Sequence, residues 1–148
     1  MKRLLYIFTW VILTCSITSC LQNNGYIGPL FGQWRLEKIE SNNIAEECDT
    51  VFFAFQSDIF SIRKVNYTNY VSMALTGLYT RNDNMMKLNF YNRWGHEVVT
   101  AQDTLLMLEE LKSLYIDEMS PIFNVKKLDW SKMELEYNDR CYYFEKLN

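Results

Sequence analysis

Few side chains in this 148-residue chain have the type and spacing that catalysis requires. Its one histidine, His96, is followed directly by Glu97, and a His-Glu pair can transfer protons. Adjacent side chains of a strand point to opposite faces, so the two would not act together on one substrate. The histidine and the cysteines lack zinc-ligand spacing, and no phosphate loop or nucleophile elbow is present. We therefore expect no catalytic residue, metal site or cofactor, and expect that the protein is not an enzyme.

A different chemistry is indicated at Cys20. A short basic start precedes an uncharged apolar run at residues 4–13, which is too short to span a bilayer and is typical of a secretory signal peptide. The sequence ITSC at residues 17–20 follows and resembles the bacterial lipobox, in which the cysteine sulfur is joined to diacylglycerol. We predict that residues 1–19 are removed and that lipidated Cys20 anchors the chain in a membrane. An ordinary signal peptide with a chance cysteine is the alternative.

The segment after Cys20 predicts where the protein is located. Residues 20–30 are rich in Asn and Gly and fit a lipidated tether, and residues 31–148 fit a single domain. Loss of two basic residues with the signal changes the formal charge from −3 to −5, which gives no attraction to nucleic acid. Residues 21–24 lack the acidic side chains of a surface-export signal. We expect attachment to the bacterial outer membrane, on the periplasmic face rather than the cell surface.

Two thiols, Cys48 and Cys141, remain in the mature domain once Cys20 is lipidated. In an oxidising compartment they could form a disulfide, which would close a loop of about 90 residues and contribute on the order of 4 kcal/mol. Two unpaired thiols are the alternative, because the sequence does not give the distance between them.

Segments with alternating apolar and polar residues recur along the domain, with turn residues between them. Ser-Asp at residues 57–58 and Asn-Asp at residues 138–139 fit tight hairpin turns. We predict eight antiparallel strands, and closure into an up-and-down barrel would leave no unpaired edge. The predicted strands are residues 32–40, a hairpin at 50–65, a second hairpin at 71–91 and three strands within 121–147.

The two tight turns also predict which side chains face one another. In both hairpins the register given by the turn makes one face apolar throughout, which favours that register. The predicted pairs on these faces are Phe53 with Ile62, Phe55 with Phe60, Leu135 with Tyr142, and Met133 with Phe144.

A helical pattern interrupts the strands at residues 100–118. Thr100 and Asp103 have capping-box spacing, and apolar residues follow at helical intervals. The polar side of this segment is acidic, which is the wrong sign for an anionic lipid surface. We predict an amphipathic helix of about four or five turns that packs against the strands.

The order of these elements resembles a known family. Gly32-Gln33-Trp34 is similar to the Gly-x-Trp signature of lipocalins, and the succession of motifs resembles the small lipocalin-like lipoproteins of Bacteroides-type bacteria. The resemblance covers nearly all of the mature chain. It implies an all-β fold, an eight-stranded antiparallel lipocalin-like barrel with one α-helix between strands five and six, and a cell-envelope location. The matching motifs after the lipobox and tether are Trp34-Arg35-Leu36, Phe55 to Ile62, Gly77-Leu78-Tyr79 and Tyr142 to Lys146.

Ligand binding depends on whether the barrel is hollow. An eight-stranded barrel is either filled by its own side chains or holds one small ligand. Large side chains are predicted to point inward on almost every strand, and only Gly77 is clearly small. We predict a mostly packed interior with at most a shallow cavity at one mouth. The predicted inward residues are Trp34, Leu36, Phe53, Phe55, Phe60, Ile62, Leu75, Tyr79, Met86, Leu88, Phe90, Met133, Leu135, Tyr142 and Phe144.

Two binding functions remain open for a lipid-anchored envelope module. In the first, a small apolar or amphiphilic ligand lies at the barrel mouth against Trp34, Tyr79, Phe90 and Tyr142. In the second, the barrel is filled and the outer surface binds an envelope protein. Pairing of the first and last strands would also place Lys146 over the Trp34 ring as a cation, in place of the usual lipocalin arginine.

Overall fold

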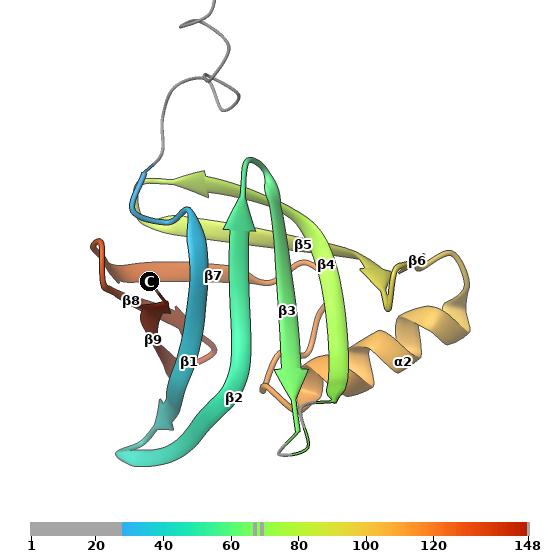
Figure 1. The fold of residues 1–148 in the computed structure, drawn as a ribbon, viewed down its shortest axis with the longest axis horizontal. Coiled ribbons are helices and arrows are strands. Elements are labelled where there is room, and N and C mark those ends of the chain that lie inside the picture. The colour runs from blue at the N-terminus through green and yellow to red at the C-terminus, as the bar shows by residue number, and fades with distance from the viewer. Residues whose placement is uncertain (1–27, 67, 69, 148) are drawn as a thin grey trace, which may run out of the picture.

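The computed structural model describes residues 28–66, 68 and 70–147, and the side chain of Asp49 is not described. The predicted signal peptide, Cys20 and most of the tether therefore lie outside the described residues. The chain forms a closed antiparallel barrel with one helix beside it (Figure 1). Its elements are β1 (Gly32–Ser41), β2 (Ile44–Gln56), β3 (Ile59–Val65), β4 (Val71–Asn82), β5 (Met85–Arg93), β6 (His96–Glu97), α2 (Ala101–Lys112), β7 (Ile122–Leu128), β8 (Lys132–Tyr137) and β9 (Arg140–Leu147).

The barrel is closed by hydrogen bonding all the way round. The strands follow the order β4-β3-β2-β1-β9-β8-β7-β5, and pairing of β4 with β5 completes the ring. The first and last strands pair antiparallel, as predicted. Two-residue β6 adds only to β5, so eight long strands make the wall.

The predicted cross-strand registers are confirmed. Phe53 lies opposite Ile62 and Phe55 opposite Phe60 in one hairpin. The β8–β9 hairpin likewise has the predicted pairs. Its turn residues, Asn138 and Asp139, both have positive φ, as a type I′ turn requires. A slip of one residue would have moved every apolar side chain to the solvent face.

The start of the second strand and the order of the elements differ from the prediction. The second strand begins at Ile44 rather than residue 50, after a tight turn at Asn42 and Asn43 with φ of 51° and 64°. The short β6 was not predicted, so the helix lies between β6 and β7 and not between the fifth and sixth strands. Residues 44–49 lack apolar alternation, and a two-residue strand is too short to give a pattern.

The helix begins where predicted and ends early. Thr100 caps it, and the capping box with Asp103 is complete. It stops at Lys112, although the apolar spacing continues, because the chain turns into the barrel end at Leu114 and Ile116, which are both buried. Among the described residues no helix is long and apolar enough to cross a membrane.

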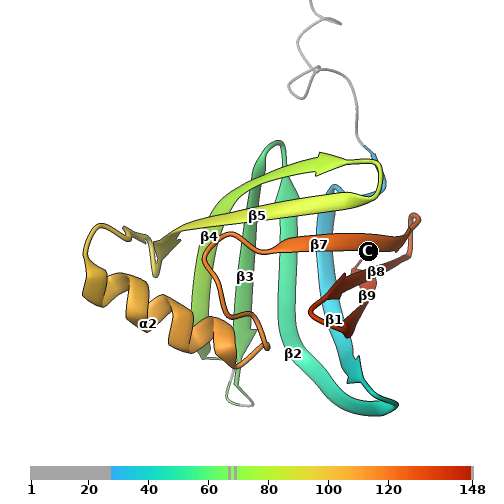
Figure 2. The same cartoon turned by 180° about the vertical axis from the view of Figure 1, so that it is seen from behind.

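The core fills the barrel and continues under the helix. Every predicted inward residue is buried except Tyr79, which is half-buried. Met107 and Leu111 of α2 join the same cluster. Seen from behind, the helix and the segment after it cover the lower end of β3 and β4 (Figure 2). The core is therefore one cluster that extends from the barrel interior to the helix and to Leu114 and Ile116 after it.

Candidate functional site

The barrel interior is occupied by aromatic rings packed against one another. Ring centroids are 4.9 Å apart for Phe53 and Phe144 and 4.9 Å apart for Phe60 and Phe90, and both contacts are edge-to-face. Phe123 makes a further contact of this kind with Tyr142, at 5.5 Å. Such pairs contribute about 0.5–1.5 kcal/mol beyond the burial of their area.

Gly77 is the inward position that could have left room for a ligand. A Cβ added there would collide with the backbone oxygen of Asn89 and with the ring of Phe60. The space opposite this glycine is therefore taken by Phe60, whose register partner it is. The one clearly small inward residue accommodates a ring and does not open a pocket.

The end of the barrel from which residue 28 leaves is closed by the two ends of the domain. The indole of Trp34 is fully buried and donates its N–H to the carbonyl of Leu30 at 2.8 Å. The Nζ of Lys146 lies 5.2 Å from the centre of the Trp34 ring and donates to the carbonyl of Pro29 at 2.8 Å. This confirms the prediction for Lys146, whose pKa is lowered by burial. We call this the Trp34 end.

The turn between β7 and β8 adds a second indole at the Trp34 end. Trp130 is largely exposed, and Lys146 Nζ lies 5.4 Å from the centre of its ring. Asp129 holds the turn by accepting backbone N–H bonds from Ser131 at 2.8 Å and Lys132 at 2.7 Å. These bonds lower the pKa of Asp129 to about 2.

The opposite end is closed by the segment that follows the helix, and we call it the plug end. Leu114 and Ile116 are buried there, and Tyr115 between them has a left-handed backbone with φ of 59°, which is unusual for a bulky residue. The hydroxyl of Tyr142 donates to the carbonyl of Leu114 at 2.8 Å. Burial raises the pKa of Tyr142.

Further tyrosines bind the plug end to acidic side chains. Tyr137 donates its hydroxyl to Asp117, with Glu118 nearby at 3.2 Å, and its pKa is raised by burial and by these carboxylates. Tyr115 donates to Glu46 at 2.5 Å, which raises the pKa of Tyr115. The second end is therefore closed by apolar contacts and by hydrogen bonds.

An ion pair connects the helix to the barrel wall. Arg93 at the end of β5 lies 2.8 Å from Glu110 of α2, and the indole N–H of Trp94 donates to the same carboxylate at 3.3 Å. One nitrogen of Arg93 and one oxygen of Glu110 are buried without a partner among the described residues. Because both side chains are partly screened by solvent, we treat this pair as positioning the helix.

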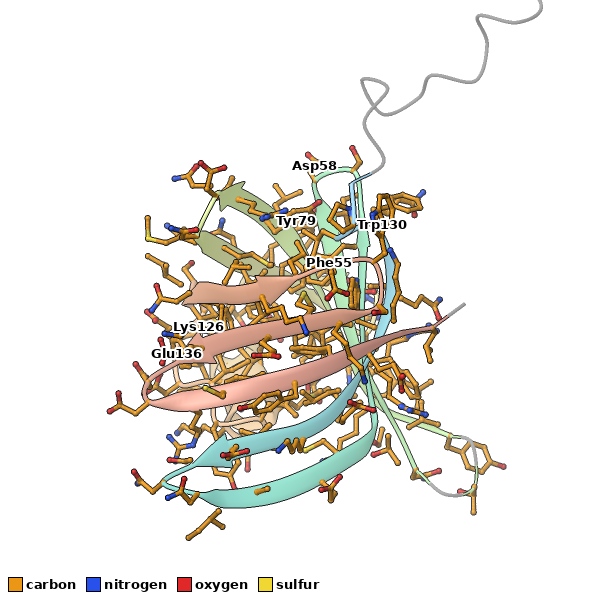
Figure 3. All side chains as sticks on the ribbon, turned by 90° about the vertical axis from the view of Figure 1, so that its left-hand side faces the viewer. Phe55, Asp58, Tyr79, Lys126, Trp130 and Glu136 are labelled. Carbon is orange, nitrogen blue, oxygen red and sulfur yellow. The ribbon has the colours of Figure 1, made fainter. Side chains whose placement is uncertain are left out.

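The four predicted ligand-binding residues are not brought together around one space. Trp34 and Tyr142 are fully buried at opposite ends, and Phe90 is buried against Phe60. Tyr79 alone is half-buried; it packs edge-to-face on Phe55 at 5.2 Å and donates its hydroxyl to the carbonyl of Ser57 at 2.7 Å (Figure 3). If a ligand contacts any of the four, Tyr79 is the most accessible.

The possible disulfide is not formed. Cys48 and Cys141 are both free. Cys48 packs against the core, and burial raises its pKa, whereas Cys141 precedes inward-facing Tyr142 on β9 and so lies on the outer face. The barrel wall stands between the two thiols.

The pair His96-Glu97 forms β6 and is exposed on both residues. Across the described residues no cluster of histidine, cysteine, aspartate and glutamate could hold a metal ion. Neither residue contacts the aromatic interior, so the structure gives this pair no place at a site.

The outer wall carries groups that the sequence did not single out. On the outer face of β1, β8 and β9, Glu145 lies 2.9 Å from Arg35 and 3.4 Å from Lys132, which also pairs with Glu37 at 3.2 Å. Lys126 and Glu136 form a similar pair on β7 and β8 (Figure 3). These ion pairs could be found from the sequence only after the cross-strand register was known, because the register decides which charged residues lie opposite one another.

Comparison with known proteins places the fold. A family model described as a lipocalin-like domain matches residues 13–147. A lipocalin-like protein from Bacteroides uniformis has a solved structure with 20% identity and a TM-score of 0.64, covering 81% of this chain and 100% of that one. An uncharacterized protein from Bacteroides eggerthii has 21% identity and a TM-score of 0.64, with 80% and 99% covered. No curated protein matched. The chain therefore belongs to the lipocalin-like domain family.

Proposed function

We propose that the protein is a non-enzymatic, lipid-anchored module of the bacterial cell envelope that binds a protein partner with its outer surface. The observation that carries the proposal is the filled interior. Lipocalin-like folds generally bind ligands in the barrel, but here Phe60 fills the space beside Gly77 and both ends are covered. With the interior occupied by its own rings, the outer surface is what remains for recognition.

The anchor and the location rest on the sequence around Cys20. The sequence ITSC at residues 17–20 and the Asn/Gly-rich tether at residues 20–30 fit a lipid-anchored domain. The two solved relatives in fold come from Bacteroides species, and this supports placing the protein in the outer membrane, with the periplasmic face preferred. Cys20→Ala should leave the protein as a slower-migrating precursor outside the membrane fraction. Unchanged fractionation would remove the anchor from the proposal.

A second candidate function is binding of a small amphiphilic ligand at the Trp34 end. It is favoured by Tyr79, which is half-buried near the β2–β3 turn and packs on Phe55. A ligand there would have to lie over the rings rather than between them, because Phe55 is buried. Its polar group could share the carbonyl of Ser57 that Tyr79 now uses.

Native mass spectrometry of the protein purified from its own host separates the two functions. The proposal predicts the mass of the lipidated chain, alone or with a protein subunit. A small apolar or amphiphilic molecule bound one to one would contradict it and favour the second function. Cys20→Ala, purified in the same way, is the control that separates a bound ligand from the attached lipid.

A further inference from the structure

The hairpin between β1 and β2 extends beyond the barrel and has one edge without a partner strand. Residues 44–47 of β2 pair with β1. Pairing of β2 with β3 begins only at Val51 and Lys64. Both ribbon views show the tip of this hairpin apart from the lower ends of β3 and β4 (Figures 1 and 2). Within the described part of the chain, no backbone hydrogen bond joins residues 44–47 to a strand other than β1.

The turn geometry shows which backbone groups face this free edge. Asn42 and Asn43 form a two-residue turn, so Ser41 and Ile44 make the first hydrogen-bonded pair. Hydrogen-bonded and non-hydrogen-bonded pairs alternate along an antiparallel ladder. The N–H groups of Ala45 and Glu47 therefore point away from β1, toward the free edge. Their side chains, like those of Ile44 and Glu46, are exposed.

The charge of this edge indicates the kind of strand that would add to it. Among the described residues neither Glu46 nor Glu47 forms an ion pair. The Glu46 carboxylate accepts the Tyr115 hydroxyl at 2.5 Å and keeps its negative charge unpaired. The two carboxylates lie on opposite faces of the ribbon because they are consecutive. A second copy pairing antiparallel through this edge would bring acidic residues opposite acidic residues, which is unfavourable. An incoming strand with basic residues at two consecutive positions would meet both carboxylates.

We infer that residues 44–47 bind an extended segment of a protein partner by strand addition, with a consecutive basic pair opposite Glu46 and Glu47. Main-chain bonds to Ala45 and Glu47 supply affinity, and the basic pair supplies specificity. The exposed side chain of Ile44 adds an apolar contact at the tip. The inference rests on the proposed function, because it specifies the outer surface that the partner would use.

The test uses the full-length protein in detergent and a labelled six-residue peptide, Thr-Val-Lys-Lys-Val-Thr. The control peptide has both lysines replaced by glutamate. Fluorescence anisotropy measures affinity, and hydrogen exchange reports on individual amides. The lysine peptide should bind and slow exchange at Ala45 and Glu47, and the glutamate peptide should not. Ala45→Pro removes one edge donor and should weaken binding about tenfold, the ratio expected for one backbone hydrogen bond.

Charge removal gives a second test that leaves the backbone intact. Replacing both Glu46 and Glu47 by Gln should weaken binding severalfold at low salt and reduce its salt dependence. Glu109→Gln, at an exposed acidic position of α2, should change neither.

Three results would overturn the inference: equal binding of the glutamate peptide, no protection of the Ala45 and Glu47 amides, or a concentration-dependent dimer that protects them without peptide. None of these results would show a ligand inside the barrel. The proposed function is contradicted by a different result, a small molecule bound one to one in native mass spectrometry.

Discussion

The two ends of the barrel are closed in different ways. At the Trp34 end the chain closes on itself, because the first and last strands pair and bring Trp34, Pro29 and Lys146 into contact. At the plug end an inserted segment carries Leu114 and Ile116 into the core. Pairing of the first and last strands is part of every closed barrel. The plug segment is an additional element between β6 and β7, so the plug end is where this chain departs from an up-and-down barrel made of strands and turns alone.

The largest effect is expected at the Trp34 end. Trp34→Ala would remove a fully buried indole and its hydrogen bond to Leu30, and should lower the free energy of unfolding by about 3–5 kcal/mol. Trp130→Ala, at a largely exposed position, is the matched control. Urea unfolding of both variants would measure the difference. Equal losses for the two would contradict the closure described for this end.

At the plug end, Ile116→Ala should cost about 2–4 kcal/mol, because Ile116 is fully buried. Ile59→Ala removes the same groups from an exposed position of the wall and should cost far less. Thermal unfolding of both variants is the measurement. A small loss for Ile116→Ala would mean that the segment lies loosely on the barrel and leaves its mouth accessible.

A smaller effect is expected from the hydroxyl that joins the two parts of the plug end. Tyr142→Phe would leave the carbonyl of Leu114 without its main donor and should cost about 1–2 kcal/mol. Tyr143→Phe, on the outward side of the same strand, serves as the control. If both variants unfold at the same denaturant concentration, the bond to the plug contributes nothing to stability.

The smallest effect concerns the turn that carries Trp130. The pKa of Asp129 is lowered to about 2 in the folded chain by backbone N–H groups of Ser131 and Lys132, so its contribution is complete above about pH 4. That contribution is lost as the pH falls toward 2. The stability difference between wild type and Asp129→Asn should therefore shrink between pH 4 and pH 2. A difference that does not change over this range would contradict the assignment.

Much of the barrel wall, including the Trp34 end, could be predicted from the sequence. Tight turns at residues 57–58 and 138–139 determine registers that make one face apolar, and these registers are confirmed. Pairing of the first and last strands then places Lys146 opposite Trp34, as observed. Local turn chemistry and the two-residue period carry this information, so no tertiary contact had to be known.

The segment that closes the plug end could not be predicted in the same way. The apolar spacing of Leu111, Leu114 and Tyr115 continues the helix, but the chain leaves the helical path at Ser113 and Tyr115 takes a left-handed backbone. Burial of Leu114 and Ile116 in the barrel end accounts for this change, and such tertiary contacts override helix propensity. Phe123 and Tyr137 are also buried but were not predicted to point inward. A register shift between Val125 and Lys127 interrupts the two-residue period in this part of the chain.

The central claim is that the interior is filled, and titration with a fluorescent fatty acid tests it most directly. The full-length protein in detergent is titrated with cis-parinaric acid, with competition by unlabelled palmitate, and Ile116→Ala is run alongside wild type. If the barrel is filled, wild type should show no saturable binding that palmitate displaces. Weak binding is expected only for Ile116→Ala, in which a side chain of the plug segment is shortened. Saturable one-to-one binding to wild type, lost on Tyr142→Phe or Phe90→Ala, would contradict it.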